Sequence, residues 1–173
     1  ASNPNATLAF NAPIATIQAT NSGSIGTGQA AISPSNILLT NKALLDVRDP
    51  VQGGTVQLDG HNITLTSGSK VFAGVIPSSL EKNSELSVTN LDPTILATLP
   101  TSGDIIARAT DTITLDGGLT FFSNGVDPDS VGNAGNTTLN AQLIQLSNGG
   151  RVYTGTEGLG NAGNLSLTAD KLT

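Results

Sequence analysis

The sequence predicts an all-β protein, a right-handed parallel β-helix (solenoid) with coils of about 26 to 28 residues and one inserted loop or hairpin. Three observations predict this fold class. One pentapeptide recurs at a fixed spacing, short runs alternate between apolar and polar residues, and glycine-containing groups separate the runs. Alternation with a period of two is typical of strands, so we expect strands and not helices.

The repeat is clearest in the last third of the sequence. Gly-Asn-Ala-Gly-Asn stands at residues 132–136 and again at 160–164, which is a spacing of 28 residues. Apolar residues follow Gly135 at offsets of 4, 9, 11 and 17, and they follow Gly163 at offsets of 4 and 9. Three earlier glycines share this frame, so the sequence predicts five coils. The repeat glycines are Gly28, Gly54, Gly103, Gly135 and Gly163.

The frame assigns one set of apolar side chains to the interior, where equivalent residues of successive coils are expected to stack. In the coil that starts at Gly103 the frame fits only if one residue is inserted near Ala109-Thr110. The predicted interior residues are Ile32, Ile37, Leu39, Leu45, Leu58, Ile63, Leu65, Val71, Ala107, Ile113, Leu115, Phe121, Leu139, Ile144, Leu146, Val152, Leu167 and Leu172.

Turn residues separate the alternating runs and predict the corners of each coil. They supply the positive φ angles that a chain turning a corner requires. The predicted corners are Asp59-Gly60, Ser67-Gly68, Asp116-Gly117-Gly118 and Asn148-Gly149-Gly150.

Asparagines recur at matching places in the frame. Asn136 is expected to lie over Asn164, and Asn36 over Asn62, so that each pair forms an amide ladder between coils. The alternative is that these asparagines simply favour turns, and the sequence leaves both interpretations open.

We expect residues 1–173 to be a single fragment of a β-helix, excised from a longer protein. Residues 1–27 are less regular and predict a distorted first coil, with Leu8, Phe10, Ile14 and Ile17 as its apolar residues. The frame is interrupted between Gly54 and Gly103, which predicts an insertion at about residues 75–101. Its prolines and charges favour a loop or a small hairpin that projects from the solenoid.

Composition excludes several classes of function. A net charge of −6 repels nucleic acids and anionic membrane surfaces, so we expect no nucleic-acid partner. The chain has no cysteine, which excludes disulfides and thiolate metal sites. No apolar run approaches the roughly 18 residues that span a bilayer, so we expect no membrane insertion.

Candidate ligand residues are few. The single histidine, His61, is interpreted as an exposed corner residue and not as a metal ligand or general base, because no second histidine or cysteine completes a site. The segment 124–129 is rich in oxygen ligands, and Asp127 and Asp129 are weak candidates for binding Ca²⁺. Without the spacing of a calcium loop, a solvated turn is the default interpretation, and we expect no cofactor.

Some β-helices act on polysaccharides with acidic and basic residues on one outward face. Asp104, Arg108 and Asp111 are close enough in sequence to suggest such a cluster. We favour an ion pair on a solvated face, because Asn136 and Asn164 replace Asp104 in the following coils. The sequence therefore names no catalytic residue, and a carbohydrate-active enzyme, a polysaccharide lyase or hydrolase, remains the alternative to a structural or adhesive role.

Several segments resemble a known family. They are Gly53-Gly54-Thr55-Val56, the runs at residues 62–66 and 111–115, and the two Gly-Asn-Ala-Gly-Asn motifs with the strands that follow them. Over about residues 28–173 the chain resembles the cyanobacterial filamentous haemagglutinin-like exoproteins, which leave the cell by two-partner secretion.

The resemblance implies an adhesin-like stalk or binding surface of a large protein secreted to the bacterial cell surface. It also implies two partners. One is an outer-membrane two-partner secretion transporter, engaged through a region outside this fragment, and the other is an undetermined cell-surface or glycan ligand. Asn3-Pro4-Asn5 is similar to an element of the secretion domain, but Ala6-Thr7 departs from its continuation, so that role is not carried over.

Overall fold

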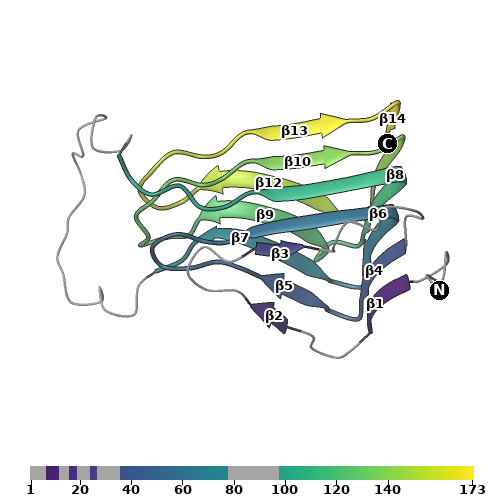
Figure 1. Ribbon diagram of the computed structural model, residues 1–173, viewed down its shortest axis with the longest axis horizontal. Coiled ribbons are helices and arrows are strands. Elements are labelled where there is room, and N and C mark those ends of the chain that lie inside the picture. Colours follow the sequence, from purple (N-terminus) through teal and green to yellow (C-terminus); the bar gives the residue numbers. More distant parts are fainter. Residues whose placement is uncertain (1–6, 12–15, 19–23, 27–35, 78–97) are drawn as a thin grey trace.

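The computed structural model of the chain is all-β. Its strands form two sheets, and within each sheet the paired strands are parallel (Figure 1). The structure describes residues 7–11, 16–18 and 24–26 as backbone, and residues 36–77 and 98–173 with their side chains. Within these ranges there is no α-helix. Accordingly, the described part contains no helix long and apolar enough to cross a membrane.

The strands are short, except for two of 12 residues. In chain order they are β1 (Thr7–Asn11), β2 (Thr16–Gln18), β3 (Ser24–Gly26), β4 (Asn36–Thr40), β5 (Leu44–Asp46), β6 (Thr55–Thr66), β7 (Lys70–Val75), β8 (Ile105–Asp116), β9 (Phe121–Val126), β10 (Thr137–Asn140), β11 (Leu143–Ser147), β12 (Arg151–Thr156), β13 (Leu165–Thr168) and β14 (Lys171–Leu172).

The chain alternates between the two sheets. The larger sheet has the order β1-β4-β6-β8-β10-β13, with β3 paired to β6, β11 to β8 and β14 to β11. The smaller sheet has the order β2-β5-β7-β9-β12. Each pass of the chain adds a strand to the larger sheet, then one to the smaller sheet, and returns to pair in parallel with the strand of the previous pass (Figure 1).

The strand register matches the sequence frame. In the larger sheet Leu58 pairs with Ala107, Ala107 with Leu139, and Leu139 with Leu167, which are the residues at offset 4 from four repeat glycines. The next interior residues pair in the same way: Ile37, Ile63, Ile113, Ile144 and Leu172 follow one another across the strands, at offset 9 or, for Ile113 after the extra residue in its coil, offset 10. The predicted parallel stacking of equivalent residues is therefore confirmed for these positions.

The core lies between the two sheets and is built from these columns. Leu39, Leu65, Leu115 and Ile144 are fully buried, and the core cluster draws its side chains from both sheets. Leu146, Val152 and Leu167 are only partly buried against it. Leu172 is 56% exposed because β14 is the edge of its row of strands, so its predicted burial is wrong. Ile32 lies outside the described residues.

One predicted interior residue is displaced by one position. Val71 pairs with Phe122 and not with Phe121, and Phe122 is fully buried whereas Phe121 faces outward. The cause is the turn before β9: residues 117–120 separate it from β8, one residue more than the three that separate β7 from β6. A shift of one residue exchanges the two faces of a strand, so the assignment of Phe121 to the interior is wrong.

The corners of each pass use left-handed backbone conformations, as predicted for most of them. Ser67 and Gly68 both have positive φ, as do Asn148 and Gly149, and Gly117 has φ of 109°. The sequence did not indicate the equivalent corner at Asn41-Lys42, where φ is 56° and 62°. Two consecutive residues with positive φ turn the chain sharply from the larger sheet to the smaller one.

The predicted corner at Asp59-Gly60 is wrong. Both residues lie inside β6, which continues through a register irregularity between Gly60 and Asn62. Gly60 faces inward and pairs with Ala109. The next two repeats also have a small, buried residue at this offset of 6, which is Ala109 after Gly103 and Ala141 after Gly135. Small side chains at this column let the strand pass close to the core where its register shifts.

The repeat glycines form a column in which the backbones of successive passes come close together. A Cβ atom added at Gly103 would overlap the backbone of Gly54, one at Gly135 would overlap the carbonyl oxygen of Gly103, and one at Gly163 would overlap that of Gly135. Only glycine fits where two backbones come this close, and this explains why a glycine recurs once in every pass. Gly28 lies outside the described residues.

A ladder of hydrogen bonds follows immediately after the glycine column. The backbone N–H of Asp104 donates to Thr55 Oγ1 (3.1 Å), that of Asn136 to Asp104 Oδ1 (2.7 Å), and that of Asn164 to Asn136 Oδ1 (3.0 Å). Each side-chain oxygen thus caps the equivalent residue of the next pass. Asn164 also donates through Nδ2 to Asn136 Oδ1 (3.2 Å), which confirms the first predicted amide ladder.

The second predicted amide pair is present as well, since Asn62 Nδ2 donates to Asn36 Oδ1 (3.0 Å). The asparagines therefore join neighbouring passes and do not merely favour turns.

The two irregular segments are described only in part. Within residues 1–27, strands β1, β2 and β3 pair in parallel with β4, β5 and β6, while Ile14 lies outside the described residues. Of the segment 75–101, residues 78–97 lie outside them too. Its described ends are bonded to the stack: Val75 is buried, and Asn133 N–H donates to the carbonyl of Pro100 (2.9 Å).

Candidate binding surface

The candidate calcium ligands are not brought together around a common point. Asn124 points into the core, Asp127 forms an ion pair with Arg48 (3.1 Å), and Asp129 lies exposed in a turn with φ of 61°. Within residues 36–77 and 98–173 no group of three or more histidine or acidic side chains is placed to hold a metal ion. The backbone geometry here is that of a turn, because Ser130 N–H donates to the carbonyl of Asp127 (3.2 Å).

The side chain of Asn124 instead forms hydrogen bonds with backbone carbonyls in and beside the glycine column. Its Nδ2 donates to the carbonyls of Gly103 and Asn136, both at 3.1 Å, and its Oδ1 accepts from Ser102 Oγ (3.3 Å). Ser102 Oγ also accepts the N–H of Gly135 (2.8 Å). Buried carbonyls without partners cost stability, so this network explains a polar residue in the interior.

The candidate enzymatic cluster is also dispersed. Arg108 Nη1 lies 3.5 Å from Asp59 Oδ1, so its acidic partner lies outside the cluster suggested by the sequence. Asp104 accepts a backbone N–H in the ladder. Asp111 lies 4.0 Å from the nitrogen Nε2 of His61, an exposed residue within β6.

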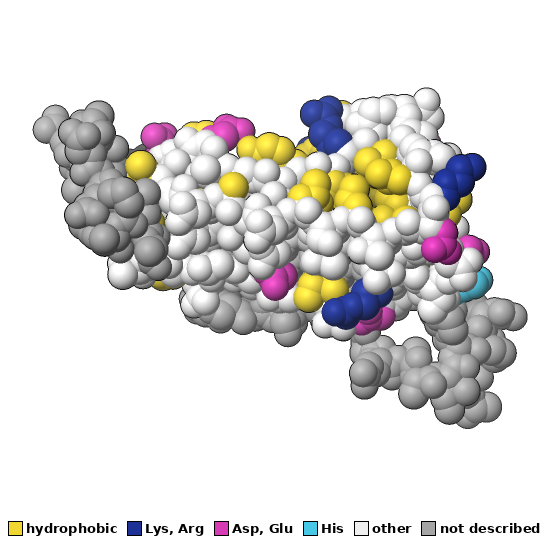
Figure 2. Space-filling view, turned by 90° about the horizontal axis from the view of Figure 1, so that it is seen from above, with side chains coloured by type: hydrophobic (Ala, Val, Ile, Leu, Met, Phe, Trp, Pro, Cys, Tyr) yellow, Lys and Arg dark blue, Asp and Glu magenta, His cyan; other side chains and the backbone are white. Residues whose placement is uncertain are grey.

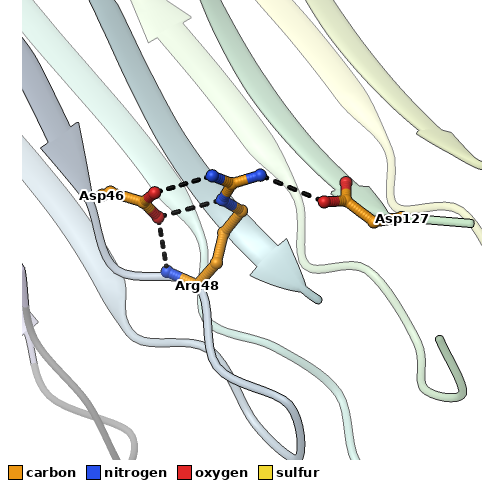
Figure 3. A network of polar contacts seen from close by, with 3 residues as sticks. All are labelled: Asp46, Arg48 and Asp127. Atoms are coloured by element: carbon orange, nitrogen blue, oxygen red, sulfur yellow. Dashed lines mark hydrogen bonds and ion pairs between the residues drawn. The ribbon is translucent and has the colours of Figure 1, made fainter. Parts of the chain in front are cut away.

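The most developed charged group lies at the end of the smaller sheet (Figure 3). Arg48 donates from Nη2 to Asp46 Oδ2 (2.7 Å) and from Nε to Asp46 Oδ1 (3.0 Å), a bidentate contact, and from Nη1 to Asp127 Oδ2 (3.1 Å). Asp46 lies in β5 and Asp127 follows β9, and β7 lies between these two strands. The guanidinium of Arg48 therefore links two strands that are not adjacent.

This network changes the pKa values of its members. Burial alone would lower the pKa of Arg48, but the hydrogen bonds and charges of Asp46 and Asp127 together raise it. Burial raises the pKa of the Asp127 carboxyl above its ordinary value, the charge of Arg48 opposes this change, and the charges of Asp46 and Glu157 add to it. The group is a structural cross-link in which two carboxylates, those of Asp46 and Asp127, share one guanidinium.

Aromatic and basic side chains gather on the outward face of the smaller sheet. The register places Lys70, Phe121 and Arg151 in one row across β7, β9 and β12, and Phe72 and Tyr153 in the next outward row. We call these five residues the cationic aromatic face. It contains three of the five aromatic residues in the whole chain, whose sequence has four phenylalanines and one tyrosine.

The rings of this face are held in defined positions. The Arg48 guanidinium stacks 4.0 Å from the centre of the Phe72 ring, and Phe72 meets Phe121 edge to face with ring centres 5.4 Å apart. Tyr153, which is 41% exposed, lies over Gly155, where a Cβ atom would overlap its ring. The absence of a side chain at Gly155 therefore leaves room for the tyrosine ring to lie against the backbone.

The cations of this face are not neutralised by acids. Lys70 Nζ lies 5.1 Å above the Phe121 ring, and Arg151 donates to the carbonyl of Gly118 (2.9 Å). Among the described residues, neither forms an ion pair. The acids closest to them in the sheets have other partners, since Asp46 binds Arg48, and Asp116 accepts from Ser147 and Asn148.

A second exposed feature is the end of the molecule that carries β13 (Figure 2). In this view, which looks towards that end of the molecule, hydrophobic side chains gather between Lys and Arg side chains. Leu165 and Leu172 are exposed here, and Leu146, Val152 and Leu167 are only partly covered. This surface is the uncovered continuation of the core.

Sequence reasoning missed the cationic aromatic face although the frame contained a signal. Lys70 and Arg151 both stand 16 residues after a repeat glycine, and Phe72 and Tyr153 both stand 18 residues after one. Residues of the same kind at the same outward offsets indicate a surface that recurs from pass to pass.

Comparisons with known protein families, with curated proteins and with solved structures found no match to this chain.

Proposed function

We propose that this chain is a stretch of a right-handed parallel β-helix that serves as a structural and adhesive segment of a large secreted bacterial surface protein. The observation that supports it is the register: equivalent residues of four or five successive passes pair in parallel across one sheet. A chain that alternates between two sheets and advances by one strand per pass follows the path of a solenoid coil. Parallel crossovers are nearly always right-handed, which gives the hand.

The architecture suits an extended role. Each pass contacts its neighbours through backbone pairing, the glycine column and the side-chain ladder, so the repeat adds length without needing a larger core. The net charge of −6 favours solubility of such an extended segment. The resemblance to filamentous haemagglutinin-like exoproteins supports export through an outer-membrane transporter that engages a different region.

Two measurements test this proposal. Far-UV circular dichroism of the chain should show β structure with little helix, because the alternating segments have a period of two. Antibodies raised against the chain should label intact cells that produce the parent protein, and protease treatment of those cells should remove the label. Signal found only after the cells are broken would overturn the surface role. Turnover of a polysaccharide by the chain would favour the enzymatic alternative.

A further inference from the structure

We infer that the cationic aromatic face binds an acidic polysaccharide of low charge density, in which sugars with carboxylates are separated by uncharged sugars. This inference deepens the proposed adhesive role and rests on it for its biological setting. It depends physically only on the outward face of the smaller sheet, that is, on Lys70, Phe72, Phe121, Arg151 and Tyr153.

The rings determine the kind of ligand. Phe121 and Tyr153 face outward on adjacent strands, and a pyranose ring presents a flat face of C–H groups that packs on such rings. A basic side chain lies over one face of each phenylalanine, Arg48 over Phe72 and Lys70 over Phe121, so Tyr153, which is 41% exposed, is the most accessible ring of this face. The three rings stand on three adjacent strands, which lie about 4.8 Å apart, with Phe121 one outward row away from Phe72 and Tyr153, and this series of rings suits a ligand made of repeating rings.

The charges determine the acidity of the ligand. Lys70 and Arg151 occupy the same row on either side of Phe121, two strands apart, which is a separation of about 10 Å between strands. Both are without an acidic partner among the described residues, so each can bind a carboxylate. A polymer with carboxylates on both sides of an uncharged ring matches the order cation, ring, cation.

The same spacing disfavours a nucleic acid. Duplex DNA carries one charge per about 1.7 Å of its axis, and proteins that bind it commonly make roughly 6 to 10 phosphate contacts. The face offers two cations that have no acidic partner among the described residues, on a chain with a net charge of −6. Long-range repulsion would therefore outweigh two phosphate contacts, whereas a sparsely charged polysaccharide experiences much less of it.

The test is isothermal titration calorimetry of the 173-residue chain with hyaluronan, in which glucuronate alternates with N-acetylglucosamine. Dextran serves as the neutral probe, polygalacturonate as the densely charged one, and a single-stranded DNA oligonucleotide as the nucleic acid. We expect hyaluronan to bind, and binding to weaken as salt screens the charges. The Lys70→Gln/Arg151→Gln double variant should bind about tenfold more weakly, which corresponds to the loss of two exposed charge contacts.

Matched variants separate the face from general effects. Lys171→Gln removes an exposed cation from the larger sheet and should leave binding unchanged. Tyr153→Ala should weaken binding at low and at high salt alike, because ring packing is not screened. Equal weakening by Lys171→Gln, equal binding of dextran, or tighter binding of polygalacturonate or DNA than of hyaluronan would overturn the inference.

Circular dichroism of each variant distinguishes the two levels of failure. If the chain has β structure but does not bind hyaluronan, the proposed binding site is wrong and the proposed β-helical scaffold is unaffected. A chain without β structure overturns the β-helical scaffold itself.

Discussion

At the scale of single residues, the repeat glycines Gly103, Gly135 and Gly163 are positions at which an added methyl group would overlap the backbone of the previous pass. Gly135→Ala places a Cβ atom against the carbonyl oxygen of Gly103, where the two passes pair and neither backbone can move away. We expect a loss of about 1 to 3 kcal/mol in the free energy of unfolding, measured by urea denaturation. The control is Gly118→Ala, where the closest atom would be 3.8 Å away, and which should be nearly neutral.

Buried rungs of the core provide the second residue-scale prediction. Leu139 and Ile144 are fully buried, and each is paired on both sides with an apolar residue of a neighbouring strand. Leu139→Ala and Ile144→Ala should each cost about 2 to 5 kcal/mol of unfolding free energy, because both leave a cavity. Gln145→Ala, on the outward face of β11, should cost little. The reverse order would mean that the register is shifted by one residue.

Two carboxyl groups should titrate in opposite directions from the ordinary aspartate value of 3.8. Hydrogen bonds from Ser147 and Asn148 lower the pKa of Asp116, so its contribution to stability is complete above pH 3.8 and is lost as the pH falls through the lowered pKa. Burial raises the pKa of Asp127, so the folded chain retains that proton longer and stability falls as the pH rises from 3.8 through the raised pKa.

Carboxyl ¹³C NMR measures both titrations directly, with Asp116→Asn and Asp127→Asn to assign the two signals. Midpoints in the opposite order would show that the hydrogen bonds at Asp116, or the burial at Asp127, are absent in solution.

At the scale of elements, one buried amide adds hydrogen bonds to the apolar contacts between the two sheets. Asn124 in β9 donates to two backbone carbonyls, that of Gly103 in the glycine column and that of Asn136, which follows Gly135. Asn124→Ala leaves both carbonyls without this donor and should cost about 1 to 3 kcal/mol. Asn124→Leu fills the space but not the hydrogen bonds, so it should also be destabilising. Asn140→Ala, on the exposed side of β10, is the control and should change thermal stability little.

The strands were predictable from the sequence where alternation and the glycine frame agree. The frame failed where a connection changes length, as between Leu115 and Phe122, because two adjacent phenylalanines fit either register equally well. It failed again at Asp59-Gly60, since aspartate and glycine are typical of turns but here occupy a bulge within a long strand. Such choices depend on pairing with the neighbouring pass, which local preference does not contain.

The cationic aromatic face illustrates a different reason for failure. Its residues are far apart in the sequence, and only the pairing of β7, β9 and β12 brings Lys70, Phe121 and Arg151 into one row. The Arg48 cross-link has the same origin, because Asp127 lies 79 residues from Arg48. The candidate acids of the sequence, by contrast, were chosen by proximity in the chain, and pairing separated them.

At the scale of the whole molecule, residues 78–97 should be dispensable for stacking. The passes on either side pair with each other along all of β6 and β8, and residues 99–102 are bonded to the next pass through Asn133. Replacing residues 78–97 by a short Gly/Ser linker should leave the circular dichroism spectrum and the thermal midpoint nearly unchanged, since loop closure costs only about 0.6 kcal/mol per doubling of length.

The original bounds of the insertion, 75–101, serve as the matched comparison. A variant that removes all of them also deletes buried Val75 and the carbonyl of Pro100 that accepts from Asn133, so it should be less stable than the shorter replacement. Loss of cooperative unfolding in the shorter replacement would show that residues 78–97 are part of the fold.

The hydrogen bonds between neighbouring passes point along the direction in which the strands stack, and this geometry determines how the molecule responds to a pulling force. Tension applied to a chain end along that direction peels one pass away from the next, bond by bond, and the passes behind it carry the load without opening. Each 28-residue pass that opens releases roughly 95 Å of extended chain. If the chain belongs to a surface filament, as we propose, that filament would lengthen in steps under shear flow and would stay attached while most of its passes remain closed.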